Sequence, residues 1–317
     1  MKDLGKLISK RIAFVFPGQG SQYVGMGKAL YEKSAAARRV FEQADEILGF
    51  SLSSLCFHGP AEDLGDTINA QPAILTVSLA YLEALRERWR ALGHNIVPSF
   101  VAGHSLGEFT ALVAAGVLDF ADALRLVRER GRLMKECGDL QPGGMAAVVG
   151  LDRDTLEEIC AEASPLGTVV VANDNCPGQS VLSGENAALD RAMELARRAG
   201  ARRVVRLDIS IASHSPLMER AAQQLSDLLS KIPLREPQVP VVANISGRIL
   251  TTVEDIRKEI AAHVVRPVQW TNSVREMAND GASAFLEIGP GQVLGGLIRR
   301  IRHDVEVMSA KDFGISG

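Results

Sequence analysis

The sequence predicts an α/β protein in which a small subdomain interrupts a larger domain. Short apolar runs of the kind found in buried parallel strands alternate with amphipathic runs of helical period, and this alternation favours an α/β architecture. In the middle of the chain the order changes to strand, helix, strand, strand, helix, strand. The 317 residues are 46% hydrophobic and 23% charged, so the chain can bury a sizeable core.

The larger part contains four apolar runs that we expect to be buried strands. They cover residues 12–16, 100–103, 239–243 and 284–288. The first run ends at Pro17 and Gly18, which is typical of a strand that leads into a turn. Helical periodicity is clear over residues 74–89, 105–115 and 121–134.

The middle of the chain begins with a turn-rich linker, QPGG, at residues 141–144. We expect strands over residues 145–149, 168–172, 180–183 and 203–209, with helices over 152–163 and 185–199. This βαββαβ order is that of a ferredoxin-like unit. The sequence therefore predicts a small ferredoxin-like subdomain at 141–209, inserted in a large α/β domain made of 1–140 and 210–317.

Charge and cysteine use exclude several classes of protein. The formal net charge of −3 argues against a nucleic-acid-binding protein. The longest apolar run, residues 109–118, is too short to cross a bilayer, and the amino-terminal segment lacks the apolar core of a signal peptide. The four cysteines show no CxxC spacing and no nearby histidine cluster: Cys56, Cys137, Cys160 and Cys176. We expect a cytoplasmic protein without a metal site or a membrane partner.

A GxSxG motif, GHSLG at residues 103–107, follows a predicted strand and precedes an amphipathic run. This is the context of a nucleophile elbow, which makes Ser105 a candidate nucleophile and favours an α/β-hydrolase-like large domain with a parallel sheet. The N–H of Leu106, at the start of the following helix, can stabilise an oxyanion. A glycine-rich turn that carries a serine without catalytic function is the alternative.

A serine nucleophile needs a base, and His214 is the candidate. It lies in IASHSPLM, residues 211–218, directly after the last strand of the small subdomain. A loop that returns from the small subdomain can carry this histidine over the mouth of the large one. His104 adjoins Ser105, but we expect its side chain to point away from the serine. A single histidine is more often structural than catalytic, so that interpretation of His214 stays open.

A second glycine-rich element, FPGQGSQ at residues 16–22, follows the first predicted strand. It lacks the lysine of a P-loop and the spacing of a GxGxxG motif. A nucleotide-phosphate loop and a plain turn are both possible interpretations. At the carboxyl end of a parallel strand, its backbone N–H groups can instead supply a second oxyanion donor.

Arg130 is a charge in an unexpected place. On a helical projection of residues 120–134, it falls inside the apolar arc, between Ala123 and Leu126. A buried, unpaired charge costs several kcal/mol, so Arg130 needs an anionic partner. That partner can be a buried protein carboxylate or a substrate carboxylate held in a bidentate fork.

Seven segments together resemble the malonyl-CoA:acyl carrier protein transacylases. The resemblance spans nearly the whole chain, and the segments occur in the family's order. They are FPGQGSQ (16–22), GHSLGE (103–108), RG (130–131), NDNCPGQ (173–179), SHSPLM (213–218), RPVQW (266–270) and EIGPG (287–291).

The resemblance implies a role for each of five residues. Ser105 would accept the acyl group, and His214 would act as its general base. Backbone N–H groups of Gln19 and Leu106 would form the oxyanion hole, and Arg130 would pair with the free carboxylate of malonate. The implied activity is transfer of a malonyl group from malonyl-CoA to the phosphopantetheine thiol of an acyl carrier protein, with no bound cofactor.

The chain departs from the family pattern in two places. Family members often carry Gln where His263 aligns, near the backbone carbonyl that orients the catalytic histidine, and we expect His263 to preserve that backbone contact. Asp174 and Cys176 stand where the fatty acid enzymes commonly read NFNSPGQ, and a change there can alter which acyl chains fit. Leu106 resembles the residue of malonyl-selective members.

The resemblance also implies partners. An acyl carrier protein is expected to be acidic, and a basic cluster near the last strand of the small subdomain includes Arg202 and Arg203. This cluster is a candidate docking site, with a solvated surface as the alternative. We expect a monomer that uses malonyl-CoA and releases coenzyme A.

Other functions stay open at this point. A polyketide synthase acyltransferase that acts in trans on another extender unit, or a hydrolase that clears acyl thioesters, would use the same serine and histidine. A non-catalytic carrier-binding module is disfavoured because Ser105, His214 and Arg130 are all present. A lipase-type hydrolase could formally use His303, but the inserted βαββαβ unit does not fit that plan.

Overall fold

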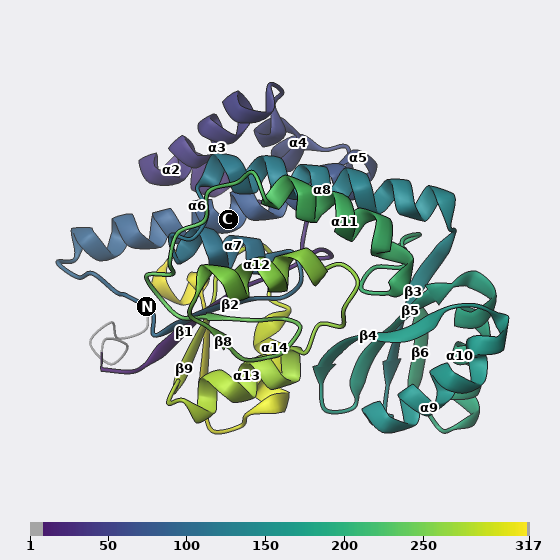
Figure 1. The fold of residues 1–317 in the computed structure, drawn as a ribbon. Helices are drawn as coiled ribbons and strands as arrows, with labels where there is room; N and C mark the ends of the chain where they lie inside the picture. The colour runs from purple at the N-terminus through teal and green to yellow at the C-terminus, as the bar shows by residue number, and fades with distance from the viewer. Residues whose placement is uncertain (1–8, 316–317) are drawn as a thin grey trace.

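The computed structural model describes residues 9–315, which form two β-sheets with helices packed around them (Figure 1). The strands of the larger sheet lie in the order β10 (Glu306–Ser309), β9 (Ala284–Glu287), β1 (Ile12–Phe16), β2 (Phe100–Gly103), β7 (Val241–Val242) and β8 (Ile249–Leu250). Neighbouring strands are parallel except β7 and β8, which are antiparallel. The predicted α/β class with a largely parallel sheet is confirmed.

The side chains of β1 alternate between two hydrophobic cores, because successive strand residues face opposite sides of a sheet. Ala13 and Val15 belong to the core beneath α13 (Trp270–Asn279) and α14 (Leu294–Ile301). Phe14 and Phe16 belong to the larger core on the other face. The helices around that core are α2 (Lys28–Lys33), α3 (Ala35–Leu48), α4 (Leu52–His58), α5 (Ala61–Gly65), α6 (Thr67–Ala91), α7 (Gly107–Ala114), α8 (Phe120–Leu140), α11 (Glu219–Leu229) and α12 (Val253–Ala262).

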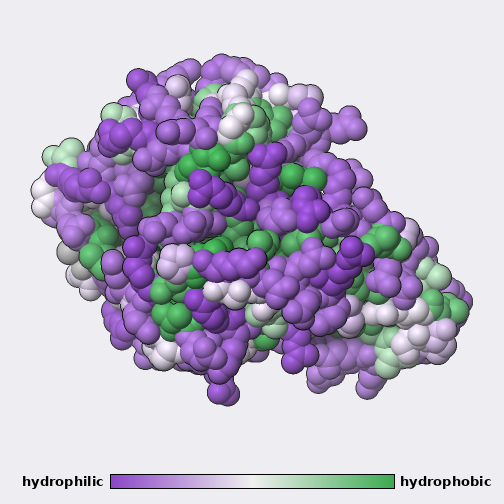
Figure 2. Space-filling view, turned by 45° about the horizontal axis from the view of Figure 1, so that its top comes forward, coloured by the Kyte–Doolittle hydropathy of each residue, from purple (hydrophilic) through white to green (hydrophobic). Residues whose placement is uncertain are grey.

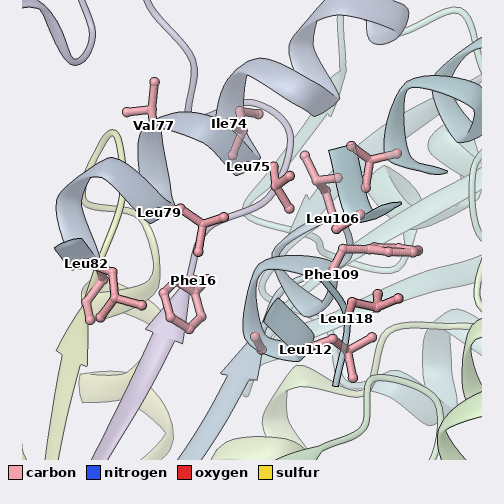
Figure 3. Close-up of a cluster of buried hydrophobic side chains, with 14 of the residues drawn as sticks. Phe16, Ile74, Leu75, Val77, Leu79, Leu82, Leu106, Phe109, Leu112 and Leu118 are labelled. Atoms are coloured by element: carbon pink, nitrogen blue, oxygen red, sulfur yellow. The ribbon is translucent and has the colours of Figure 1, made fainter. Parts of the chain in front are cut away.

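The larger core fixes α6 and α7 against β1. Figure 3 shows Phe16 of β1 close to Leu79 of α6, with Phe109 and Leu112 of α7 in the same cluster. Full burial of one such side chain contributes about 1.5–3 kcal/mol. The start of α7, two residues after Ser105, is therefore held firmly against the end of β1.

The smaller sheet has the strand order β4 (Val169–Cys176), β5 (Gln179–Glu185), β3 (Gly143–Val149) and β6 (Arg203–Arg206), and all neighbours are antiparallel. This is the order of the predicted ferredoxin-like unit. Helices α9 (Arg153–Ala163) and α10 (Asn186–Arg198) cover one face. The other face carries the buried side chains of Met145, Ala172 and Val181. The boundaries of this subdomain at residues 141 and 209 stay a prediction.

The elements differ from the sequence prediction mainly at their ends. Helix α6 begins at Thr67 because the side chain of Asp66 accepts a hydrogen bond from the N–H of Ile68 and caps it. Helix α7 begins at Gly107, two residues later than expected, because the elbow turn occupies the preceding positions. Strand β4 extends through Cys176. The short strands β8 and β10, which the sequence did not predict because neither has a long apolar run, form the two edges of the larger sheet. Single-turn 3₁₀ helices are η1 (Ser164–Leu166), η2 (Pro216–Met218) and η3 (Ala310–Phe313).

The surface carries mixed polarity. Among residues 9–315, none of the helices is both long and apolar enough to span a membrane. Figure 2 shows a mainly hydrophilic face on which hydrophobic residues form small groups. Contacts with a partner on this face would therefore be largely polar.

Candidate active site

Ser105 lies in a tight turn between β2 and α7. Its φ of 48° places it in the left-handed region, which side chains other than glycine rarely occupy. A Cβ atom on Gly103 would lie 1.8 Å from the carbonyl carbon of Gly107, and a Cβ on Gly107 would lie 2.1 Å from the carbonyl oxygen of Phe16. Only glycine fits at both positions, so the turn brings the serine hydroxyl to the carboxyl edge of the sheet.

Asn244, two residues after β7, fastens this turn from the neighbouring strand. Its side-chain Oδ1 accepts a hydrogen bond from the backbone N–H of Ser105 at 2.7 Å, and its Nδ2 donates to the carbonyl of Gly103 at 2.6 Å. The sequence analysis missed Asn244. Its place just after an apolar strand run was the available signal, because the ends of parallel strands meet at one edge of a sheet.

His214 reaches Ser105 from the loop after β6. Its Nε2 lies 2.8 Å from Oγ of Ser105, and its Nδ1 lies 3.0 Å from the carbonyl oxygen of His263 and 3.1 Å from that of Arg266. Carbonyl oxygens only accept, so the ring proton sits on Nδ1 and the lone pair of Nε2 faces the serine. The two residues form a dyad that backbone carbonyls orient in place of a carboxylate.

The surroundings of His214 keep its ring neutral. Burial, and after it the positive charge of Arg130 and the ring of His104, lower the pKa of His214 from 6.5 to about 3. The hydrogen bonds to the carbonyls of His263 and Arg266 act in the opposite direction. At neutral pH the imidazole can therefore accept a proton from Ser105.

Two backbone N–H groups near the dyad are free to bind an oxyanion. Leu106 follows the serine, at the amino-terminal end of α7, and Gln19 lies in the loop after β1 that lines the same cavity. Neither N–H has a hydrogen-bond acceptor among residues 9–315. Unpaired N–H groups at a helix start and in a loop at the sheet edge suit a developing negative charge.

Arg130 is buried on α8, as its place in the apolar arc predicts, with 1% of its surface exposed. Its Nη1 donates to Oε1 of Gln71 at 2.7 Å, and its Nη2 lies 3.4 Å from Oγ of Ser105. No carboxylate of residues 9–315 forms an ion pair with this guanidinium. Burial lowers the pKa of Arg130 to about 10, and the nearby charge of Glu108 opposes that shift. At neutral pH the group is a cation beside the nucleophile, and this favours a substrate carboxylate as its partner.

A directed chain of hydrogen bonds connects Arg130 to the loop after β1. Arg130 donates to Oε1 of Gln71, whose Nε2 donates to Oγ1 of Thr67 at 2.9 Å. Thr67 in turn donates to the side-chain Oε1 of Gln19 at 3.1 Å. The carboxylate-binding candidate and the oxyanion candidate are thus held by the start of one helix, α6. Sequence reasoning missed Gln71 and Thr67, which are buried polar residues in the first two turns of α6, before its apolar middle.

Successive residues of the NDNC segment, which ends β4, face opposite sides of the strand. Nε2 of His104 lies 2.8 Å from Oδ1 of Asn175, which lines the cavity. Asp174 instead accepts a hydrogen bond from Thr271 of α13 at 2.8 Å, and Cys176 lies in the core beneath that helix. Asp174 and Cys176 do not line the cavity, because alternate strand residues face away from it. Their effect on which acyl chains fit stays a prediction.

The cavity in front of Ser105 has a volume of about 280 Å³ and lies between the two sheets. Polar groups from the large sheet line one side. The apolar side chains of Met145 and Val181 from the smaller sheet, and of Leu294 and Leu297 from α14, line the other. An extended, mostly apolar chain with a reactive end fits such a lining.

The remaining candidates lie outside this cavity. Arg202 and Arg203 are exposed at the start of β6. Arg203 pairs with Val149 of the neighbouring strand β3, and Val149 pairs in turn with Gln179 of β5. Gln179 lines the cavity, so the two arginines lie two strands from its rim. Among residues 9–315, His, Cys, Asp and Glu side chains form no group that could hold a metal ion.

Comparison with known proteins agrees with this geometry. The acyl transferase domain family matches residues 13–312. The malonyl CoA-acyl carrier protein transacylase of Bacillus subtilis is 44% identical over 303 residues, which cover 95% of this chain and 94% of the relative. That of Escherichia coli K12 is 44% identical over 291 residues, which cover 92% and 93%.

Solved structures give the same result. The malonyl CoA-acyl carrier protein transacylase from Coxiella burnetii superimposes with a TM-score of 0.91 at 39% identity, over 96% of this chain and 94% of the other. A malonyl-transacylase in complex with a type II PKS acyl-carrier protein superimposes with a TM-score of 0.90 at 40% identity, over 95% and 96%. Since sequence, fold and site geometry agree along nearly the whole chain, the protein belongs to the acyl transferase family, among the malonyl CoA-acyl carrier protein transacylases.

Proposed function

We propose that the protein transfers a malonyl group from malonyl-CoA to the phosphopantetheine thiol of an acyl carrier protein, through an ester on Ser105. One observation carries the proposal. Oγ of Ser105 lies 2.8 Å from the base Nε2 of His214 and 3.4 Å from the buried guanidinium of Arg130. A nucleophile beside an unpaired cation suits an acyl group that carries its own negative charge.

In the first half-reaction, Nε2 of His214 accepts the proton of the Ser105 hydroxyl as Oγ attacks the thioester carbonyl carbon. The carbonyl π electrons move to oxygen, and the N–H groups of Gln19 and Leu106 stabilise that oxyanion. One such donor contributes about 3–4 kcal/mol in enzymes where its removal has been measured. The intermediate then expels the coenzyme A sulfur, which takes the proton from His214 and leaves malonyl-Ser105.

The second half-reaction runs the same steps on a different thiol. His214 accepts the proton of the phosphopantetheine thiol, whose sulfur attacks the ester carbonyl of malonyl-Ser105. Expulsion of Oγ, with return of the proton from Nε2, releases the malonyl thioester and restores the hydroxyl. The order is ping-pong, because coenzyme A leaves before the carrier protein reacts.

Arg130 selects the acyl group. A malonyl carboxylate can accept two parallel hydrogen bonds from a guanidinium. An acetyl group would leave the buried cation unpaired, and sites with buried polar groups reject substrates that leave them unpaired by orders of magnitude. This also separates the proposal from a thioester-clearing hydrolase, which has no need of a carboxylate anchor.

The exposed Arg202 and Arg203 supply positive charge for an acidic carrier protein. They lie two strands from Gln179, which lines the cavity. We therefore keep them as the docking candidates. A monomer, with a cytoplasmic location suggested by four free, buried cysteines, completes the proposal.

The test is the mass of the intact protein after brief exposure to malonyl-CoA, acetyl-CoA or methylmalonyl-CoA. The wild type should gain one malonyl group on Ser105, hold it in the absence of carrier, and lose it on addition of holo acyl carrier protein. Ser105→Ala should gain none. Preferential labelling by methylmalonyl-CoA would instead assign another extender unit, and rapid loss of the label to water would assign a hydrolase.

A further inference from the structure

His263 has a side-chain role that its backbone role does not explain. Its carbonyl oxygen accepts from His214, and any residue at this position could offer that carbonyl. The imidazole itself is 1% exposed and lies with Nδ1 3.4 Å from Nη2 of Arg130. On the other side of the ring, Nε2 lies 3.1 Å from Oε2 of Glu108, which is also fully buried.

Because Arg130 can only donate hydrogen bonds, it determines which nitrogen of the His263 ring carries the proton. A guanidinium can only donate, so Nδ1 of His263 must offer its lone pair. The proton of the neutral ring then sits on Nε2 and faces Glu108. Nε2 and Oε2 of Glu108 lie 3.1 Å apart but form no hydrogen bond with each other. Burial, together with the charge of Arg130, lowers the pKa of His263 and keeps the ring neutral.

Packing fixes the ring in this position. The imidazole meets the ring of Phe109 edge to face, with centroids 5.6 Å apart, and the ring of His214 at 5.5 Å. Phe109, at the start of α7 (Figure 3), also lies under the guanidinium of Arg130, 5.6 Å from the ring centroid. A rigid imidazole therefore stands behind the end of the guanidinium that lies nearest to Ser105.

The two ends of the guanidinium are held by different residues. Gln71 holds Nη1 through a 2.7 Å hydrogen bond, and Nδ1 of His263 faces Nη2. The Nε atom of Arg130 has no hydrogen-bond partner in the described chain. Orientation of the group beside Ser105 thus depends on these two acceptors.

We propose that the His263 imidazole is a positioning residue that sets acyl specificity: it holds Nη2 of Arg130 beside Ser105. The inference rests on the proposed function, since it needs malonyl-Ser105 to form. It predicts that the side chain of His263 matters for a charged acyl group and little for a neutral one, because acetyl does not use Arg130.

The experiment compares rate constants for acylation of Ser105 by malonyl-CoA and by acetyl-CoA, measured by quenched flow and intact mass. His263→Leu removes the acceptor but keeps the backbone carbonyl that orients His214. The malonyl rate should fall about tenfold, as expected for loss of one weak bond to a charged group, while the acetyl rate changes less than about twofold. His263→Gln, whose amide can both accept and donate, should restore the malonyl-to-acetyl ratio to within about threefold of wild type. The exposed His303→Leu is the matched control and should match the wild type.

Several results would overturn the inference. The first is a malonyl-to-acetyl rate ratio in His263→Leu equal to that of the wild type. The second is an equal loss of the malonyl and acetyl rates in His263→Leu, which would indicate a role in the fold or through His214. The third is a His263→Gln variant whose malonyl rate is as low as that of His263→Leu. Absence of any malonyl label on the wild type would overturn the proposed function, and this inference with it. A normal label with an unchanged ratio would overturn this inference alone.

A second measurement, NMR of the histidine rings, does not depend on whether His263→Leu folds. Two-dimensional ¹⁵N NMR of histidine rings distinguishes a protonated from an unprotonated Nδ1, and the His263→Gln spectrum assigns the signal. In the wild type, His263 should be neutral with its proton on Nε2. A proton on Nδ1, or a positively charged ring at pH 7, would exclude acceptance from Arg130 and overturn the proposal.

Discussion

The imidazole of His214 and the hydroxyl of Ser105 lie 2.8 Å apart although 109 residues separate them along the chain. The serine follows a strand of the large sheet, and the histidine follows the last strand of the small one. Backbone carbonyls, and no acidic side chain of residues 9–315, hold the far side of the imidazole. Proton transfer in this site therefore depends on the folded backbone more than on any third catalytic side chain.

The first prediction concerns pH. The pKa of His214 is lowered to about 3 by burial and by the charge of Arg130 and the ring of His104, so the base stays unprotonated well below 6.5. The second-order rate of Ser105 acylation by malonyl-CoA should stay nearly flat from about pH 8 to about pH 5.5, where a free imidazole would be mostly protonated. A rate that halves near pH 6.5 would show that His214 titrates like an exposed histidine.

The second prediction concerns Arg130. Arg130→Ala should lower the kcat/KM for malonyl-CoA by at least about a hundredfold, because the acyl carboxylate loses a charged partner. Acetyl-CoA should lose much less, so the ratio of the two constants should shift toward acetyl. The exposed Arg125→Ala on the same helix is the control. If the ratio of kcat/KM for malonyl-CoA to that for acetyl-CoA is the same in Arg130→Ala as in the wild type, Arg130 does not recognise the acyl carboxylate.

The third prediction concerns Asn244, which pairs with the backbone on both sides of the elbow turn. Asn244→Ala leaves the N–H of Ser105 and the carbonyl of Gly103 without these partners, at about 1–3 kcal/mol for each buried group. We expect a lower melting temperature and roughly a ten- to hundredfold slower acylation for malonyl and acetyl alike, since the turn positions the nucleophile itself. The exposed Asn272→Ala should change neither quantity. Selective loss of malonyl transfer would contradict this role.

The fourth prediction concerns the contact between α8 and α6. A Cβ atom on Gly131 would lie 2.5 Å from the carbonyl oxygen of Thr67, whereas a Cβ on Gly296 in α14 meets nothing within 4 Å. Gly131→Ala should destabilise the fold by about 1–3 kcal/mol through overpacking, and displace the neighbouring Arg130. Gly296→Ala should be neutral, or stabilise by up to about 1 kcal/mol through helix propensity. Urea unfolding of both variants measures the difference, and equal stabilities would contradict the close helix contact.

The fifth prediction concerns the carrier protein. Reversal of both charges, Arg202→Glu with Arg203→Glu, should slow transfer from malonyl-Ser105 to holo carrier several-fold at low salt and leave loading from malonyl-CoA unchanged. The same double reversal at the exposed Lys33 and Arg39 is the control, because α2 and α3 lie away from the small sheet (Figure 1). If the rate of transfer to the carrier protein changes neither with salt nor with charge reversal, Arg202 and Arg203 are solvated surface residues and not a docking site.

Much of the fold was predictable because each buried strand and amphipathic helix leaves a local pattern. The apolar run at 12–16 and the βαββαβ order in the middle of the chain are such patterns, and both elements form as expected. Strands β8 and β10 were missed for a physical reason. An edge strand buries less of its surface and needs fewer apolar residues, so its sequence looks like a loop.

The site was predictable only in part. Ser105 and Arg130 leave local signals, one a glycine-flanked turn and the other a charge on an apolar helix face. Asn244 and Gln71 act through tertiary contacts, and their neighbours in sequence give no sign of the partner. The side-chain contacts of His263 belong to the same class, since periodicity cannot show that Glu108 and Arg130 meet on either side of one ring.

The left-handed backbone at Ser105 and His214 has a consequence for engineering. Among residues 9–315 these are the non-glycine positions with positive φ, and such a conformation costs an L-residue about 1–2 kcal/mol. Glycine would relieve that cost at either position and end turnover. A selection for heat tolerance alone would thus reward inactive sequences, and libraries screened for durability need a parallel screen for acyl transfer.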